Sequence, residues 1–121
     1  RSHRVWGGLA EGEVRIVEKP SDVPDDLENY VLVARETTPD MTSLIYNEDD
    51  SGERTLRAVA MITEEGGKTC HAAITARENG IPTLVGIKDA TRDLKDGMHI
   101  YVDASQGLVY DLSHDLTKEE R

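Results

Sequence analysis

One histidine, His71, stands in a stretch whose composition would make its imidazole chemically useful. The stretch reads TEEGGKTCHAAITARENGIPTLVG from Thr63 to Gly86. A neutral imidazole is a nucleophile near pH 7. The first turn of a helix supplies unpaired backbone N–H groups and the positive end of the helix dipole, both of which favour anions. A phosphoryl group accepted by a histidine in such a turn would therefore lie beside donors that stabilise its charge.

The elements expected around His71 form a strand, a glycine turn and a helix. The apolar run Ala58–Ile62 is short and β-branched enough for a buried strand. A glycine pair follows, and it permits backbone conformations that other residues avoid. Thr69 can cap a helix over residues 69–79, and Gly80 stands where helices commonly end. This order of elements places His71 in the first turn of the helix.

The residues of this stretch are also compatible, in part, with other chemistries. Taken by itself, a histidine here is more often a packing or capping residue than a nucleophile. Gly67, Lys68 and Thr69 imitate the end of a nucleotide-binding P-loop, but Ile62 occupies the position of the glycine that such a loop requires. Helix neighbours point about 100° apart, so Cys70 is not expected to use His71 as its base. It is interpreted as a small buried residue.

Two basic side chains lie near His71 in the sequence, and the chain also contains residue types that can bind metal ions. Lys68 and Arg77 can offset phosphate charge, and a plain surface role for either fits equally well. No metal site is predicted, because the cysteine and the histidines lack the spacing typical of zinc ligands. The residues in question are Cys70, His71, His99 and His114.

The residues GGKTCHAAITARENGIPTLVG resemble the signature of the phosphohistidine (mobile, swivelling) domain of phosphoenolpyruvate-utilising enzymes. That family includes phosphoenolpyruvate synthase, pyruvate phosphate dikinase, enzyme I of the sugar phosphotransferase system and rifampin phosphotransferase. The segments Val31–Met41, Asp89–Thr91, Leu94–Gly97 and Val102–Tyr110 are also similar to the family, so the resemblance covers roughly residues 7–112. The TCH and ARENGIP segments favour the phosphoenolpyruvate synthase (pyruvate, water dikinase) branch.

The resemblance implies an α/β fold and a set of residue roles. The fold would be a swivelling β/β/α domain with a mixed central sheet, a smaller strand layer and helices packed on one side. His71 would carry the phosphoryl group, and Thr69 would be the target of a regulatory kinase/phosphorylase. A phosphate on Thr69 would oppose phosphoryl transfer by adding negative charge beside the nucleophile. The residues expected to position the phosphoryl group are Gly66, Gly67, Lys68 and Arg77.

The resemblance also implies partners that this chain does not itself contain. An ATP-grasp nucleotide-binding domain and a phosphoenolpyruvate/pyruvate-binding barrel are expected, with Mg²⁺ and ATP held by those flanking domains and no cofactor in this one. His71 would shuttle the phosphoryl group between them. The alternative is a non-catalytic regulatory or docking domain of the same fold, such as those appended to some pyruvate kinases.

Composition excludes several broad classes of function. The 121 residues have a net charge of −10, which argues against a nucleic-acid or anionic-membrane surface. A single cysteine excludes an internal disulfide and suits a reducing cytoplasm. No apolar run approaches membrane-spanning length, and no signal peptide is visible. With no phenylalanine, the core must be mainly aliphatic.

Periodicity and turn residues predict the remaining elements. Strands are expected at 13–17, 30–34 and 82–85, a hairpin at 98–103 with 108–110, a short helix near 41–46, and a turn or short helix at 88–94. Residues 47–53 are expected to form a charged loop inside an insertion relative to the family, which leaves the subfamily open. Residues 1–6 are assigned to an N-terminal segment or expression remnant, 7–112 to the domain, and 113–121 to a charged tail or a helical linker.

Overall fold

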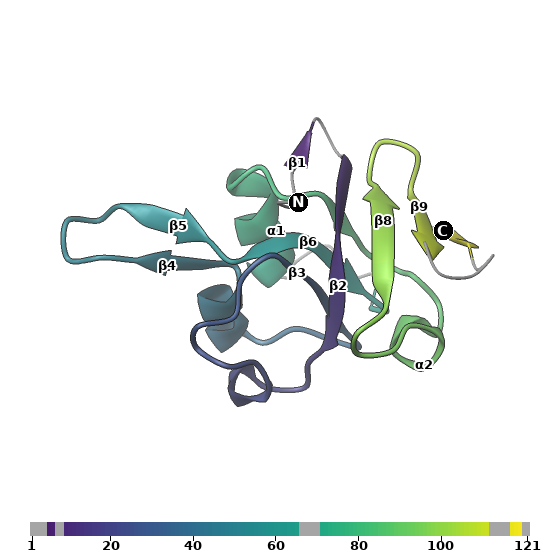
Figure 1. Cartoon of the computed structure of the whole chain (residues 1–121), viewed down its shortest axis with the longest axis horizontal. Helices are drawn as coiled ribbons and strands as arrows, with labels where there is room; N and C mark the ends of the chain where they lie inside the picture. Colours follow the sequence, from purple (N-terminus) through teal and green to yellow (C-terminus); the bar gives the residue numbers. More distant parts are fainter. Residues whose placement is uncertain (1–4, 7–8, 66–70, 112–116, 120–121) are drawn as a thin grey trace.

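The computed structural model describes residues 5–6, 9–65, 71–111 and 117–119, which form one mixed sheet with helices on both faces. Figure 1 shows this sheet at the centre of the molecule, with a separate two-stranded hairpin projecting from it. Seven strands follow the order β10-β9-β8-β2-β3-β6-β7, and an eighth, β1, pairs with β2. In chain order the sheet strands are β1 (Val5–Trp6), β2 (Leu9–Ile16), β3 (Tyr30–Ala34), β6 (Ala58–Thr63), β7 (Thr83–Leu84), β8 (His99–Asp103), β9 (Leu108–Asp111) and β10 (Thr117–Glu119).

Short helices and the projecting hairpin connect these strands. The helical segments are the 3-10 helices η1 (Pro20–Asp22) and η2 (Pro39–Leu44) and the α-helices α1 (His71–Glu78) and α2 (Ala90–Asp93). The hairpin consists of β4 (Tyr46–Glu48) and β5 (Arg54–Leu56), which pair antiparallel.

The four strands β2, β3, β6 and β7 run parallel to one another. Every residue of β3 and β6 is buried, as expected for parallel strands that are covered on both faces. Strands β8, β9 and β10 continue the sheet antiparallel from β2. The carboxyl ends of the parallel strands therefore meet at one edge, which is where ligands usually bind in open α/β sheets.

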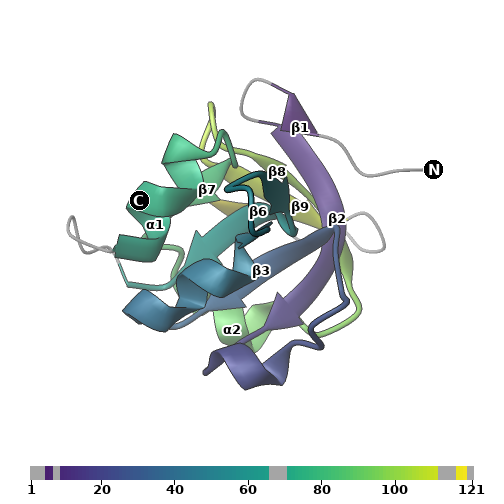
Figure 2. The ribbon, with the colours of Figure 1, turned by 90° about the vertical axis from the view of Figure 1, so that its left-hand side faces the viewer.

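Figure 2 shows the curvature of the sheet. Two separate apolar clusters cover its two faces. One cluster includes Val31 and Val33 of β3 with Ala90 and Leu94 around α2. The other joins Leu32, which points to the opposite face, to η2 and α1. The expected α/β fold, a mixed sheet with helices packed on it, is confirmed. Helices α1, η1 and η2 lie on one side of the sheet as expected, whereas the buried face of α2 packs on the other side. Besides this curled sheet, β4 and β5 form a separate two-stranded sheet.

The predicted strands at 13–17, 30–34, 58–62 and 82–85 and the hairpin around residues 104–107 are confirmed. The predicted loop at 47–53 is wrong at its start, because Asn47 and Glu48 pair with Thr55 and Arg54 in the β4–β5 hairpin. The helical linker is wrong for residues 117–119, since β10 pairs with β9. Both segments form strands because their backbone N–H and C=O groups pair with those of a neighbouring strand.

Tyr30 should make the domain sensitive to alkaline pH. Its hydroxyl donates a 2.5 Å hydrogen bond to the carbonyl oxygen of Leu44. Burial raises the pKa of Tyr30 to about 12, although the charge of Arg57 acts in the opposite direction. The folded pKa exceeds the unfolded value, so this contribution is complete below pH 10 and is lost between about pH 10 and pH 12. We expect the free energy of unfolding to fall by about 2 kcal/mol over that range.

Urea unfolding at several alkaline pH values measures this loss, with Tyr30→Phe as the comparison. The phenylalanine variant should be less stable at pH 8, because the Leu44 carbonyl loses its donor. Its stability should then fall less steeply above pH 10 than that of the wild type. Equal slopes for the two proteins would show that Tyr30 is not the group responsible.

Candidate functional site

Helix α1 carries the chain from the carboxyl end of β6 back to the start of β7. Because β6 and β7 are parallel, α1 forms the crossover of a βαβ unit. Pairing continues past the end of β6, where Glu64 N–H donates to the Ala34 carbonyl and Glu65 N–H to the Arg35 carbonyl, at 3.1 and 3.0 Å. The helix therefore follows the edge at which the parallel strands end, and His71 is its first described residue.

Small residues hold α1 close to the sheet. Ala72, Ala73 and Ala76 are almost fully buried in the cluster that also contains Met61 of β6. Alanine has the highest helix propensity and lets a helix axis approach its neighbour closely. The opposite side of the helix is exposed at Ile74.

The helix ends as its sequence predicts. Gly80 has a φ of +77°, a left-handed conformation that glycine adopts without strain. The Ile81 N–H donates to the Ala76 carbonyl and the Gly80 N–H to the Arg77 carbonyl, at 2.9 and 3.0 Å. This pair of bonds is the Schellman arrangement, which satisfies the last carbonyls of the helix.

The predicted site residues are distributed as follows. His71 is the first residue of α1, whereas Gly66, Gly67, Lys68, Thr69 and Cys70 lie outside the described residues. Arg77 is exposed in the last turn of α1, roughly 9 Å along the helix axis from His71 at 1.5 Å per residue. The roles of these residues in positioning a phosphoryl group stay predictions.

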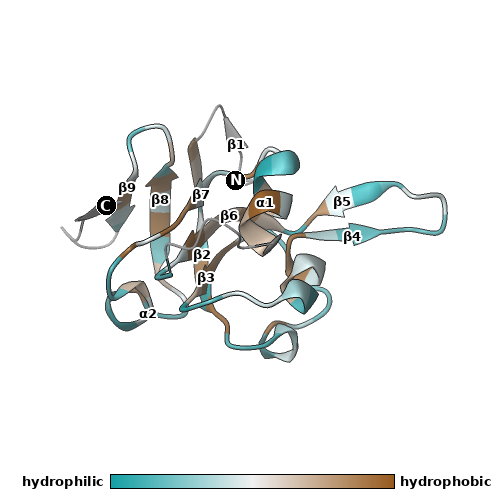
Figure 3. Cartoon of the chain, turned by 180° about the vertical axis from the view of Figure 1, so that it is seen from behind, coloured by the Kyte–Doolittle hydropathy of each residue, from teal (hydrophilic) through white to brown (hydrophobic). Residues whose placement is uncertain are grey.

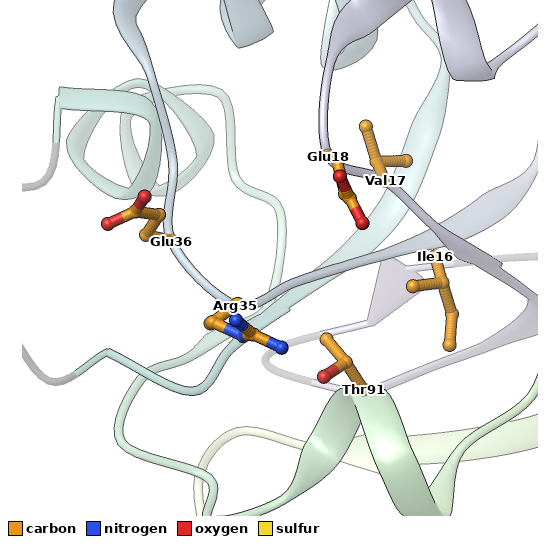
Figure 4. Close-up of a pocket in the computed structure, with 6 residues that line it drawn as sticks. All are labelled: Ile16, Val17, Glu18, Arg35, Glu36 and Thr91. Carbon is orange, nitrogen blue, oxygen red and sulfur yellow. The ribbon is translucent and has the colours of Figure 1, made fainter.

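A cavity of about 250 Å³ opens at the carboxyl edge of the sheet, and the motifs in the sequence gave no indication of it. Figure 4 shows the Arg35 side chain extending toward Thr91, with Glu36 turned away from it. Arg35 directly follows β3 and is exposed. The one sequence feature that could have identified Arg35 as a site residue is its position directly after a buried strand. Residues that follow parallel strands lie together at one edge of the sheet. The lining residues are Ile16, Val17, Glu18, Arg35, Glu36 and Thr91.

A carboxylate–hydroxyl contact fixes α2 beside this cavity. The Glu64 carboxylate accepts hydrogen bonds from the Thr91 backbone N–H at 2.7 Å and from the Thr91 hydroxyl. An acidic group at the start of a helix also interacts favourably with the helix dipole. Glu64 thus ties the chain after β6 to the first turn of α2, two segments that are distant in the sequence.

We expect Thr91→Val to lower the free energy of unfolding by about 1 kcal/mol, since one acceptor oxygen of Glu64 loses its hydroxyl donor. Guanidinium chloride unfolding measures the change. Thr91→Ser, which keeps the hydroxyl, is the matched control and should lie closer to the wild type. Wild-type stability in Thr91→Val would show that the hydroxyl bond to Glu64 contributes nothing measurable.

Among the described residues, no group of three or more histidine, cysteine, aspartate or glutamate side chains could hold a metal ion. No helix in the described part of the chain is both long and apolar enough to cross a membrane.

Comparison with known proteins identifies relatives of most of the chain. Residues 27–107 match the family model described as PEP-utilising enzyme, mobile domain. The chain is 42% identical over 104 residues to the probable phosphoenolpyruvate synthase of Archaeoglobus fulgidus, which covers 86% of this chain and 12% of that protein. It is 42% identical over 103 residues to the phosphoenolpyruvate synthase of Pyrococcus furiosus, covering 85% and 11%.

A solved structure supports the same fold. The solution structure of an Enzyme I protein aligns with a TM-score of 0.57 and 32% sequence identity, over 73% of this chain and 33% of that one. The chain spans only about 12% of the length of the Archaeoglobus relative. The similarity therefore concerns one domain of much larger enzymes.

Proposed function

Because the chain belongs to the mobile-domain family of PEP-utilising enzymes, we propose that it carries a phosphoryl group on His71 in a phosphoenolpyruvate synthase-type phosphotransferase. The observation that carries this proposal is the position of His71. It is the first described residue of α1, the helix of eight residues that connects the parallel strands β6 and β7. The unpaired N–H groups of a first helical turn suit the added negative charge of a phosphoryl group.

The transfer needs a nucleophile and a leaving group in line. An imidazole nitrogen of His71 attacks the phosphorus atom of phosphoenolpyruvate, and a P–N bond forms as the P–O bond to the enol oxygen breaks. The released enolate takes a proton and becomes pyruvate. The reverse sequence makes phosphoenolpyruvate from pyruvate and phosphorylated His71. Catalysis of this kind depends mostly on positioning and on charge stabilisation.

The other parts of this chemistry are assigned to flanking domains. At an ATP-grasp domain, His71 would accept a pyrophosphoryl group from ATP, and water would then release inorganic phosphate and leave one phosphoryl group on His71. A barrel domain would hold phosphoenolpyruvate or pyruvate. Mg²⁺ bound there would neutralise the charge on the phosphoryl oxygens. Thr69 would be the site of regulatory phosphorylation, since charge added beside His71 opposes transfer. The curated relatives support the synthase over an appended docking domain.

The test is phosphoryl transfer from ³²P-labelled phosphoenolpyruvate to the full-length parent protein, followed by mapping of the labelled residue. We expect an acid-labile, base-stable label on His71. A folded protein that takes up no label would support the non-catalytic docking alternative. A label on Thr69 or Cys70 would mean that a different atom accepts the phosphoryl group.

A further inference from the structure

The β4–β5 hairpin extends away from the body of the domain (Figure 1). All its residues from Asn47 to Leu56 are exposed, and only Tyr46 at its base is half-buried. It therefore adds little to the core. An exposed arm that does not stabilise the fold calls for another use.

The structure of the arm is nevertheless well defined. The Asp49 carboxylate accepts hydrogen bonds from the Ser51 N–H, the Ser51 hydroxyl and the Glu53 N–H, at 2.9, 2.6 and 2.9 Å. Hydrogen bonds from Ser51 and Glu53 lower the pKa of Asp49, so this turn is held at neutral pH. Arg54 pairs with Glu48 at 3.0 Å and lies 4.3 Å above the centroid of the Tyr46 ring. A preordered arm loses less entropy on binding than a flexible loop.

The base of the arm lies beside the exposed face of α1. The hydrogen bond to Glu48 raises the pKa of Arg54 most, and Glu78 of α1 is close enough to contribute to the same shift. Figure 3 shows α1 next to the base of β5, where the arm changes from hydrophilic to hydrophobic. Leu56 and Ile74 are the two large apolar side chains that are exposed in the described part of the chain, at 41% and 43%. One belongs to β5 and the other to α1.

We propose that the β4–β5 hairpin and the exposed face of α1 form one docking surface for a basic, partly apolar surface on another domain of the parent protein. This inference rests on the proposed carrier function of His71. Ile74 is one helical turn from His71, so a domain that covers Ile74 is brought to the start of α1. Another domain of the parent protein is the expected binding partner, because about 88% of the Archaeoglobus protein lies outside the matched part.

Charge decides what kind of surface fits. The arm carries four carboxylates and one arginine, and Glu48 and Asp49 are already engaged with Arg54 and the turn. Within the described residues, the carboxylates of Asp50 and Glu53 have no hydrogen-bond or ion-pair partner. Lysine and arginine on the partner would complement them, and its apolar part would cover Leu56 and Ile74. Such charges at the rim of an interface mainly affect the association rate.

The experiment uses the full-length parent protein and measures two half-reactions separately, with labelled ATP and with labelled phosphoenolpyruvate. The variant Asp50→Asn/Glu53→Gln removes two charges and leaves the Asp49 turn and the Glu48–Arg54 pair intact. Leu56→Thr removes the apolar contact and keeps a residue that favours strands. The matched control, Asp25→Asn/Asp26→Asn, removes two charges from another exposed segment.

We expect both hairpin variants to slow labelling of His71 in one half-reaction by about fivefold, equivalent to about 1 kcal/mol, and to leave the other unchanged. The charge variant should also weaken the dependence of that rate on salt, whereas the control should behave as wild type. Wild-type rates in both half-reactions, or an equal slowing of both, would overturn the docking proposal. Absence of label from wild-type His71 would instead refute the carrier function itself.

Discussion

His71→Asn is expected to abolish phosphoryl transfer by the parent protein, with a loss of more than about 10⁴-fold, because asparagine offers no nucleophilic ring nitrogen. The fold should persist. The packing of α1 rests on Ala72, Ala73 and Ala76, which the substitution leaves unchanged. Rapid-quench labelling with phosphoenolpyruvate measures the transfer, and urea unfolding of the same protein measures the stability.

The matched control is His99→Asn. His99 lies on β8, and its ring Nε2 is 3.5 Å from a carboxylate oxygen of Glu11. This histidine is half-exposed and is not part of the proposed site, so its variant should be labelled at the wild-type rate. If the two variants lost the same fraction of activity, or if His71→Asn failed to fold, the carrier role of His71 would be contradicted.

Arg57→Met should be strongly destabilising, by about 3 kcal/mol. The arginine is 4% exposed and donates hydrogen bonds to three backbone carbonyls, those of Leu27, Ser43 and Pro24, at 3.3, 2.8 and 2.8 Å. Its guanidinium also lies 5.8 Å from the centroid of the Tyr30 ring. Methionine fills a similar volume but leaves the three carbonyls without this donor.

Thermal and urea unfolding measure this effect, and Arg57→Lys is the informative comparison. Lysine keeps the charge but cannot reproduce the planar arrangement of donors, so its stability should fall between those of the wild type and Arg57→Met. If lysine matched the wild type, the charge alone would account for the role of Arg57. If methionine cost less than 1 kcal/mol, the three hydrogen bonds would not be what secures these loops.

Local patterns sufficed to predict the elements around His71. The runs Tyr30–Ala34 and Ala58–Ile62 are continuously apolar because both faces of their strands are covered. The end of the helix could be predicted because Gly80 adopts a left-handed conformation that few other residues tolerate.

Long-range contacts were not predictable in this way. Residues 47–53 have the polar, glycine-containing composition of a loop. An exposed hairpin has no buried face, so its hydrophobic pattern does not differ from that of a loop. The cavity joins Glu18, Arg35 and Thr91, which only the sheet topology brings together. Arg57 has the same explanation, since its acceptors lie in η2 and in the loop between η1 and β3, both distant from it in the sequence. For Gly66, Gly67, Lys68 and Thr69, the sequence remains the sole basis of the predicted roles.

The pairing of β2 with β8 has a consequence for how the domain is made. Leu9 pairs with Asp103, which lies far along the sequence from it, so the middle of the sheet cannot close until β8 has left the ribosome. Contacts this distant in sequence slow folding, because a long loop must close before they form. Until then β2 presents an open edge, and such edges promote aggregation. We therefore expect a nascent chain that stops before residue 98 to need a chaperone, whereas one that extends past β9 should fold without help.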